Sequence, residues 1–573
     1  MAMLAKYVPI LNWGRRYSRD KFGRDFLAAV IVTIMLIPQS LAYALLAGLP
    51  PEVGLYASIL PLVAYAIFGS STSLAVGPVA VVSLMTAAAI GRIAQEGSAD
   101  YASGAIVLAL LSGGILALMG LFRLGFIANF LSHPVISGFI TASGLIIATS
   151  QVGGLLGISS TGHAMPELVG SLTENLGQFN PYTFVVGAAS LAALIWVRLG
   201  MKRALAALGL SPVAATFAVR SAPVIVVLLA IAASAVFDLG AKGVALVGNV
   251  PQGIPVLSMP TLELDVIGAL IVPALIISIV GFVESISVAQ TLAAKKRERI
   301  DPDQELLGLG AANIASAIGS GFPVTGGFAR SVVNHDAGAA TPAAGMFTAV
   351  GIAIATLLLT PFLALLPKAT LAATIVVAVL ALVDFSILAR AWAYSRADFL
   401  AVATTLAGTL VIGVEAGISL GVVASLVVFF YRSSRPHMAI VGRVPGTEHF
   451  RNIDRHDVRT DPHILALRVD ESLYFANARY LEERIAGEIS ARPEITEVIL
   501  MCPAINAIDM SALESLEAIN IRLTEQGIGL NLSEVKGPVM DRLKRTDFLN
   551  HLNGKVFLSH HDAVAALSAN RGP

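Results

Sequence analysis

A glycine pair and an arginine interrupt an otherwise apolar stretch of the chain. Residues 321–342 read GFPVTGGFARSVVNHDAGAATP. The pattern predicts an extended segment over residues 322–328 and a short helix that begins at Ala329. A helix that begins inside a protein leaves its first backbone N–H groups unpaired and carries about half a positive charge at that end. With Arg330 in the first turn, this helix end is predicted to bind an anion.

A second helix start of the same kind is predicted near Val79, in the stretch GPVAVVSLM. Pro78 suits the first turn of a helix. Two such helix starts that face each other would create a small electropositive cavity at the middle of the bilayer. The competing interpretations are that Gly326 and Gly327 serve only close helix packing, and that Arg330 reaches the interface or pairs with an acid. An arginine far from both membrane faces costs about 3 kcal/mol on insertion scales, which favours a functional role.

Three further polar residues lie inside apolar stretches. Glu284 lies in ALIVPALIISIVGFVESISVAQTLAAKK. Its carboxylate either forms a permanent ion pair with a cation such as Arg330, or changes protonation state between conformations and couples proton movement to transport. Gln39 follows Pro38, which frees a backbone acceptor, and Tyr43 lies one helical turn later. Both are expected to contact the anion, and ordinary helix packing is the alternative for both.

These residues belong to a chain whose composition is typical of an integral membrane protein. Of its 573 residues, 56% are hydrophobic and 13% are charged, and the mean hydropathy is +0.77. The formal net charge is zero, so bulk charge indicates neither a nucleic acid nor an acidic partner. Cys502 is the single cysteine, which excludes an intrachain disulfide and a multi-cysteine metal site. No arrangement of nucleophile, base and oxyanion donors can be read from the chain, so an enzyme is not expected.

Apolar segments between residues 26 and 431 predict about fourteen membrane spans. Basic residues gather in one set of loops, such as VRLGMKRA and AAKKRER, whereas the alternate loops, such as QEGSAD and VEAG, are acidic or neutral. The positive-inside rule therefore places both ends in the cytoplasm. We expect the membrane to be the inner (plasma) membrane. One short or broken segment in each half of this region is what an inverted repeat with a midplane site predicts.

Composition also predicts how the chain divides. Charged residues become frequent after about residue 437, where strands such as HILALRV alternate with helical stretches such as ARYLEERIAGEI. We expect a cytoplasmic N-terminal segment over residues 1–24, which lies along the membrane surface, and a transmembrane anion-transport domain over residues 25–432. A linker over residues 433–460 and a cytoplasmic α/β domain over residues 461–573 are expected to follow.

Four separated motifs resemble the sulfate permease (SulP) family of anion transporters in sequence and in order. They are IPQSLAYALLAGLPPEVGLYAS, GPVAVVSLM, ESISVAQTLAAKKRERIDPDQELLGLGAANIASAIGSGFPVTGGFARSVVN and the soluble C-terminal domain. The resemblance implies fourteen spans in a seven-plus-seven inverted repeat, with core and gate domains and an elevator-like shift of the core. It places the anion between half-helices that begin at Val79 and Ala329, near Gln39, Tyr43 and Arg330. Many relatives have a serine where this chain has Ala329, so a hydroxyl contact would be missing here.

The C-terminal domain resembles the STAS domain, which is related to anti-sigma-factor antagonists. In the stretch AINAIDMSALESLEAI, Asp509 and Ser511 fall on the family's pattern, and Ser511 matches the position phosphorylated in the antagonists. Met510 replaces the usual small residue. A helix N-cap made by Asp509 or Ser511 is the alternative that we favour. The resemblance implies regulation, dimer contact or trafficking as the role of this domain, and a cytoplasmic regulatory protein as its partner.

The leading hypothesis is a secondary active importer that moves sulfate with protons, with no other cofactor. The match of Glu284 to an ES motif of proton-coupled sulfate transporters favours proton-driven uptake over exchange. Sodium-coupled bicarbonate transport and proton-coupled C4-dicarboxylate transport are the alternatives within this class, because two helix ends and one arginine recognise charge more than identity. An anion channel on the same scaffold is the alternative from a different class. The resemblance also implies a homodimer in the lipid bilayer.

Overall fold

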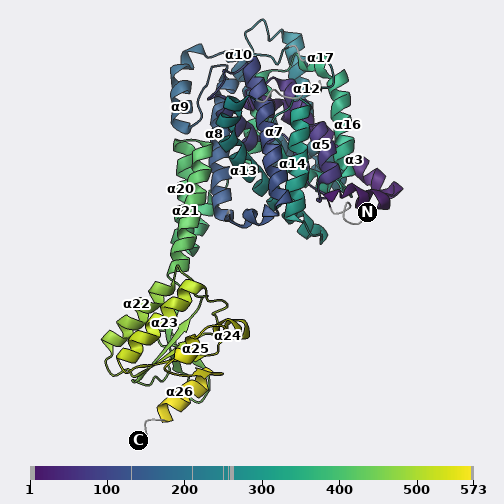
Figure 1. Cartoon of the computed structure of the whole chain (residues 1–573). Helices are drawn as coiled ribbons and strands as arrows, with labels where there is room; N and C mark the ends of the chain where they lie inside the picture. Colours follow the sequence, from purple (N-terminus) through teal and green to yellow (C-terminus); the bar gives the residue numbers. More distant parts are fainter. Residues whose placement is uncertain are drawn as a thin grey trace. The chain divides into compact units, whose positions relative to one another are not determined.

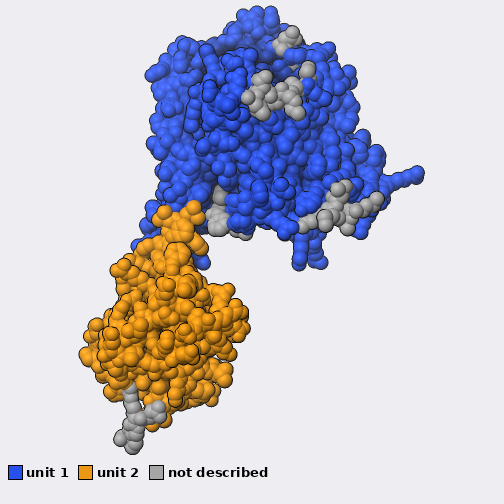
Figure 2. Space-filling model, viewed as in Figure 1, with its two compact units in different colours: residues 1–425 blue, residues 426–573 orange. Residues whose placement is uncertain are grey.

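The computed structural model describes residues 7–130, 132–209, 211–248, 251–255, 257 and 263–569. The chain forms two compact units, residues Met1–Ser425 and Leu426–Pro573 (Figure 2). Each unit has a hydrophobic core of its own. The first unit is built almost entirely from helices, and the second is an α/β unit (Figure 1).

The first unit consists of helices of very unequal length, together with two very short strands. Its α-helices are α2 (Ile10–Trp13), α3 (Arg19–Leu46), α4 (Pro51–Tyr56), α5 (Leu60–Phe68), α6 (Ala80–Ile90), α7 (Ala99–Leu121), α8 (His133–Leu156), α9 (Met165–Glu174), α10 (Pro181–Trp196), α11 (Lys202–Ala207), α12 (Pro212–Phe237), α13 (Leu264–Lys296), α14 (Pro302–Ile318), α15 (Phe328–Asp336), α16 (Ala343–Leu358), α17 (Thr360–Leu363), α18 (Lys368–Leu380), α19 (Ser386–Tyr394), α20 (Arg396–Val411) and α21 (Val414–Ser434), which continues into the second unit. Short 3₁₀ or π turns are η1 (Gly14–Arg16), η2 (Leu124–Phe130), η3 (Leu176–Gln178) and η4 (Val197–Met201).

Helix length separates spanning helices from broken ones. In the described part of the chain, seven helical segments are long and apolar enough to cross a bilayer, α3, α7, α8 and α13 among them. By contrast, α6 has 11 residues and α15 has 9. At 1.5 Å per residue these two reach only about 17 and 14 Å, roughly half of a bilayer core. Both therefore begin inside the unit.

The helices of the first unit pack as two groups. In one group, α7 packs on α13 and α14, α5 packs on α14 and α16, and α3 packs on α16. The half-helices α6 and α15 belong to this group, because both pack on α3 and α13. In the other group, α8 packs on α10, α18 and α20. We call these the first and the second helix group.

The two strands of the first unit pair with each other although they are about 250 residues apart in sequence. Strand β1 (Val76–Gly77) and strand β2 (Thr325–Gly326) are antiparallel, with Val76 opposite Gly326 and Gly77 opposite Thr325. Each strand leads directly into a half-helix. Pairing two strands of this length satisfies backbone groups that would otherwise be left without partners in the interior.

The second unit contains a six-stranded sheet. Its strands are β3 (Met438–Arg443), β4 (Phe450–Asn452), β5 (Ile464–Val469), β6 (Glu497–Met501), β7 (Gly529–Ser533) and β8 (Val556–Phe557), in the order β4-β3-β5-β6-β7-β8. The pairs from β5 to β8 are parallel, and β3 joins antiparallel to both β4 and β5. Its helices are α22 (Ala478–Ala491), α23 (Met510–Glu525), α24 (Gly537–Leu543), α25 (Phe548–His551) and α26 (His560–Ala569). The sheet thus extends into residues that composition assigned to a linker, because β3 and β4 lie there.

Candidate anion site and its setting

The paired strands bring the starts of the two half-helices together. Val79 is the N-cap of α6 and Gly327 is the N-cap of α15. A Cβ atom on Gly327 would lie 3.1 Å from Cγ1 of Val79, so the two caps are in contact. Helix α15 begins at Phe328, one residue before the expected start at Ala329, because the extended backbone ends at Gly327.

Neither helix start has a side-chain cap. In most helices a Ser, Thr, Asp or Asn side chain accepts from the first free N–H groups, and here valine and glycine take that position. The N–H groups of the first turns, three in each helix, therefore have no capping partner within the described residues. Two positive helix ends with free donors converge on one place.

Arg330 is buried against both strands. Its side chain is 2% exposed, and a Cβ atom on Gly77 would lie 3.5 Å from the guanidinium carbon. The guanidinium donates to the backbone oxygen of Pro78 and, at 3.4 Å, to that of Thr325. Its Nε is a buried donor that has no partner among the described residues. Arg330 thus ties the two tips together and keeps one donor unused.

The two glycines before α15 are required by close contacts. A Cβ atom on Gly327 would lie 3.0 Å from Nη2 of Arg330, and one on Gly326 would lie 2.6 Å from the side chain of Leu74. Close packing and the arginine site therefore both depend on the glycine pair.

The first turn of α15 has one exposed side. Phe328 is 48% exposed and Ala329 is exposed, whereas Arg330 and Ser331 directly after them are buried. The first turn of α15 is therefore exposed on the side of Phe328 and Ala329 and buried on the side of Arg330.

The other expected residues lie on the helices that hold the tips. Tyr43 on α3 is 8% exposed and lies close enough to Arg330 and Glu284 to interact with both charges. Gln39 lies one turn earlier on α3 and is half-buried. Glu284 on α13 is half-buried, and within the described residues it forms no ion pair with Arg330 despite their proximity. The permanent ion pair considered from the sequence is therefore absent in this conformation.

A network of hydroxyl and amide groups fixes β2 in place. Asn313 on α14 donates to the carbonyl of Val324 and accepts from its N–H, each at 2.9 Å. Ser285, next to Glu284, accepts from the N–H of Gly326 at 2.9 Å and lies 2.6 Å from the hydroxyl of Thr325. Sequence analysis missed these residues. Two features of the sequence could have pointed to them. Ser285 directly follows Glu284, and Asn313 is an amide side chain in a helix that otherwise consists largely of small and apolar residues.

Two hydrogen bonds also hold the segment that precedes β1 against α15. The hydroxyl of Ser331 accepts from the N–H of Ala75 at 2.9 Å, and Asn334 donates to the carbonyl of Ser73 at 3.1 Å. The two strands and α15 are therefore joined by hydrogen bonds directly beside the helix starts.

Two buried carboxylates were not anticipated. Glu305 on α14 is 0% exposed and accepts four hydrogen bonds: from Tyr65 at 2.7 Å, from both the hydroxyl and the N–H of Ser70, and from the N–H of Ser71. It holds the turn that leads into β1. Asp25 on α3 accepts from the N–H groups of residues 340 and 341 and so anchors the chain after α15. In the described part of the chain no cluster of three His, Cys, Asp or Glu could hold a metal.

Comparison with known proteins identifies the family. The model of the sulfate permease family matches residues 22–405, and the STAS domain model matches residues 455–563. The chain belongs to the sulfate permease family. The family is one of multi-pass membrane transporters, and the second unit is a STAS domain.

Relatives from plants and bacteria match almost the full length of this family member. It is 36% identical to the chloroplastic sulfate transporter 4.1 of Arabidopsis thaliana over 97% of this chain and 82% of that protein. It is 32% identical to a probable sulfate transporter of Mycobacterium tuberculosis over 98% of both chains. Among solved structures, SLC26A9 has the same fold, with a TM-score of 0.91 and 23% identity over 100% of this chain and 94% of that one. The transmembrane domain of a cyanobacterial bicarbonate transporter, BicA, is 19% identical and aligns with a TM-score of 0.60 over 72% of this chain and 98% of that domain.

In the STAS domain, Asp509 is the N-cap of α23. Its Oδ1 accepts from the N–H of Ala512 at 2.8 Å, and its Oδ2 accepts from the N–H of Phe475 at 2.9 Å. Ser511 is exposed in the first turn of the same helix, next to Met510, which is 71% exposed. The hydroxyl of Ser511 is thus accessible, while the cap is made by Asp509.

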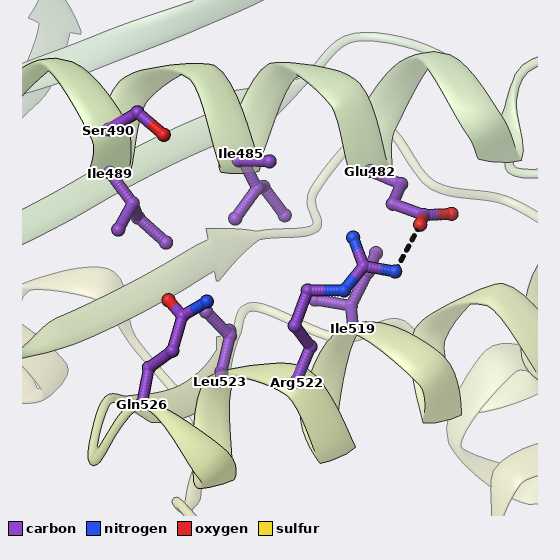
Figure 3. Close-up of a pocket in the computed structure, with 9 residues that line it drawn as sticks. Glu482, Ile485, Ile489, Ser490, Ile519, Arg522, Leu523 and Gln526 are labelled. Carbon is purple, nitrogen blue, oxygen red and sulfur yellow. Dashed lines mark hydrogen bonds and ion pairs between the residues drawn. The ribbon is translucent and has the colours of Figure 1, made fainter.

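A small cavity of about 70 Å³ lies between α22 and α23 of the STAS domain. Figure 3 shows Ile485 and Ile489 of α22 facing Ile519 and Leu523 of α23, and Arg522 of α23 reaching Glu482 of α22. This ion pair has a separation of 2.5 Å and closes one end of the cavity. The cavity is too small for a nucleotide.

Proposed function

We propose that this family member is a secondary active transporter that takes up sulfate together with protons. The observation that carries the proposal is the contact between two uncapped helix starts, with the unused Nε of Arg330 beside them. Free N–H donors and two helix dipoles attract a small anion to the starts of α6 and α15 in the interior of the first unit, whereas a surface that faces lipid offers no such donors.

The names of the relatives support sulfate as the substrate. Two relatives that match nearly the whole chain are named sulfate transporters. A doubly charged tetrahedral anion can accept from two groups of donors at once, which suits two helix starts whose caps are in contact. Bicarbonate and C4-dicarboxylates remain the comparison substrates for the assay.

The surroundings of Glu284 support proton coupling. The carboxyl group is half-buried beside Arg330 and forms no ion pair within the described residues. A carboxylate near the anion seat repels sulfate, whereas a carboxylic acid does not. Binding of sulfate therefore favours protonation of Glu284, and release of either partner favours release of the other.

The packing of the helices supports an elevator-like movement. All proposed binding residues, namely Gln39, Tyr43, Val79, Ala329, Arg330 and Glu284, lie on elements of the first helix group. That group can carry the whole seat when it shifts against the second group, so no binding contact has to break. We therefore regard the first group as the mobile core and the second as the gate.

The placement of basic residues in alternate loops of the sequence supports the orientation of the transporter in the membrane. We propose that it is a homodimer in the plasma membrane, with both ends in the cytoplasm and with a transport domain that extends to about residue 432. The exposed Ser511 supports a regulatory role for the STAS domain, through phosphorylation or through a cytoplasmic partner.

The test is sulfate uptake by purified protein in liposomes with an imposed gradient of protons or of sodium. We expect an inward proton gradient to drive accumulation of sulfate above equilibrium, and a sodium gradient to have no effect. Glu284→Gln should abolish the effect of the proton gradient while sulfate still binds. Glu174→Gln, at an exposed position on α9, is the matched control and should behave as wild type. Sodium-driven uptake, ohmic anion currents without proton dependence, or preference for bicarbonate or fumarate would overturn the proposal.

A further inference from the structure

The last turns of α21 have the composition of a boundary between lipid and water. This helix has 21 residues, about 32 Å, and it is long and apolar enough to cross a bilayer. From Leu426 onward it belongs to the second unit, where Phe429, Phe430 and Tyr431 are each more than half exposed. Arg435 follows the helix and lies over the ring of Tyr431, 5.3 Å from its centre. Exposed aromatic rings next to a basic residue are typical of the membrane boundary, which therefore lies near the end of α21.

A loop of the STAS domain is hydrogen-bonded to this helix end. The hydroxyl of Tyr474, in the loop that follows β5, donates to the backbone oxygen of Ser433 at 3.3 Å. Asn477, the N-cap of α22, donates to the same oxygen at 3.4 Å. Ser433 lies two residues after Tyr431, which is about 3 Å along the helix axis. The loop after β5 is therefore held close to the level of the membrane boundary.

Two exposed apolar side chains lie on this loop and on the segment beside it. Phe475 is 73% exposed, and its backbone N–H donates to Asp509 at 2.9 Å. Asp509 directly precedes Met510, the other exposed residue, at the start of α23. The two segments also pair through a parallel bridge between Leu473 and Ile508. We call Phe475 and Met510 the apolar pair.

The charges near the apolar pair are of both signs. Burial, and next the charge of nearby Glu471, raise the pKa of the Tyr474 hydroxyl. Glu514 is exposed one helical turn after Met510, whereas Arg435 is exposed at the end of α21. Such a mixture gives no strong attraction to anionic headgroups. Removal of the apolar pair from water is therefore the main gain that contact with a bilayer would bring.

We propose that Phe475 and Met510 insert into the boundary region of the lipid bilayer and hold the STAS domain against the membrane beside the end of α21. An aromatic ring and a flexible thioether suit the region between headgroups and acyl chains. The bilayer is the partner that the position favours, because it surrounds the end of a spanning helix to which the loop is bonded. The proposal does not depend on which anion is transported. It adds that Ser511, directly after Met510, lies at the membrane surface.

The first experiment uses the full-length protein in liposomes with a fluorescent label on one added cysteine. The native cysteine, Cys502, is buried, so the unaltered chain supplies the blank. Phe475→Cys and Met510→Cys are labelled in turn with bimane, and phospholipids brominated close to the headgroup serve as the quencher. Ile521→Cys is the matched control, because Ile521 is 59% exposed on the same helix as Met510 and lies about 17 Å further along it.

Brominated lipid should quench the labels at positions 475 and 510 severalfold more strongly than the label at position 521. The quenching should persist at high salt, because salt screens charges and leaves apolar contacts in place. Equal quenching at the three positions, or quenching that high salt abolishes, would overturn the proposal. Labels at 475 and 510 that are shielded from water but not quenched by brominated lipid would show that a second copy of the chain or another protein covers the pair, which would also overturn it.

The second experiment tests the native side chain and not the label. Phe475→Gln, added to the protein labelled at position 510, should clearly reduce quenching there, because one of the two inserting side chains is lost. Ile521→Gln in the same background is the control and should leave the quenching unchanged. If the two glutamine substitutions have the same effect, the label inserts by itself and the proposal is wrong.

Discussion

Gly327→Ala is the substitution that most selectively disturbs the contact between the two helix tips. The added methyl group would lie 3.0 Å from Nη2 of Arg330 and 3.1 Å from Cγ1 of Val79. These distances are shorter than ordinary contacts, so one neighbour must move by a few tenths of an ångström. The guanidinium is held by the carbonyls of Pro78 and Thr325, which limits its movement. The φ of residue 327 is −84°, so alanine fits the backbone and only the site is strained.

We expect this overpacking to cost about 1–2 kcal/mol of anion binding, the lower part of the range for an added methyl group in a packed interior. That corresponds to a roughly five- to thirty-fold higher Kd for sulfate. The assay is equilibrium binding of radiolabelled sulfate to purified protein, with the melting temperature measured in parallel. Gly170→Ala in α9 is the control, because a Cβ atom there meets nothing within 4 Å. An unchanged Kd in folded Gly327→Ala protein, or the same change in both variants, would refute the reasoning.

Three further predictions concern other parts of the molecule. In Glu305→Gln the amide oxygen can replace Oε1, which accepts from three donors, but the NH₂ group then replaces the oxygen that accepts from Tyr65. Loss of the charge and of this hydrogen bond should destabilise the protein by about 1–3 kcal/mol, and an unchanged melting temperature would contradict the role of Glu305. Arg92 and Glu415 form an ion pair of 2.8 Å that joins the loop after α6 to α21. Because Arg92 is largely exposed, we expect a double-mutant cycle to give a coupling energy below about 1 kcal/mol for this pair. A larger coupling energy would show that solvent does not screen the pair. Burial lowers the pKa of His560 in the STAS domain to about 4, compared with about 6.5 when unfolded. The unfolded chain therefore binds the proton on His560 more readily than the folded domain does, so the free energy of unfolding should fall by about 3 kcal/mol between pH 7 and pH 4. In His560→Gln this fall should be smaller. Equal falls in the two proteins, measured by urea unfolding, would contradict the prediction.

The sequence was informative where glycine, proline and isolated polar residues interrupt apolar stretches. Pro78 and the glycine pair marked the two helix starts to within one residue, and Arg330 was conspicuous because few other charges lie at that depth. The shift of one residue, from Ala329 to Phe328, has a simple reason. Gly327 is compatible with either an extended or a helical backbone, and the pairing of β2 with β1 decides the boundary.

Contacts between distant residues could not be read from the sequence. Glu305 lies 235 residues from Ser70, and Ser285 lies 40 residues from Thr325, so only the folded chain shows that they are partners. The strands of residues 438–452 were also missed, because β3 and β4 are antiparallel beside a parallel sheet and β4 has only three residues. Exposure was equally hidden, since Ser285 and Ser287 lie two residues apart in one apolar helix, yet Ser285 is buried and Ser287 is exposed.

The position of a bound anion tests the central claim most directly. Selenate, the heavier analogue of sulfate, can be located in crystals by its anomalous scattering. We predict one strong peak within hydrogen-bond distance of the first N–H groups of α6 and α15, close to Ala80 and Ala329. A fully occupied peak elsewhere in the first unit, with the two helix starts empty, would contradict the account.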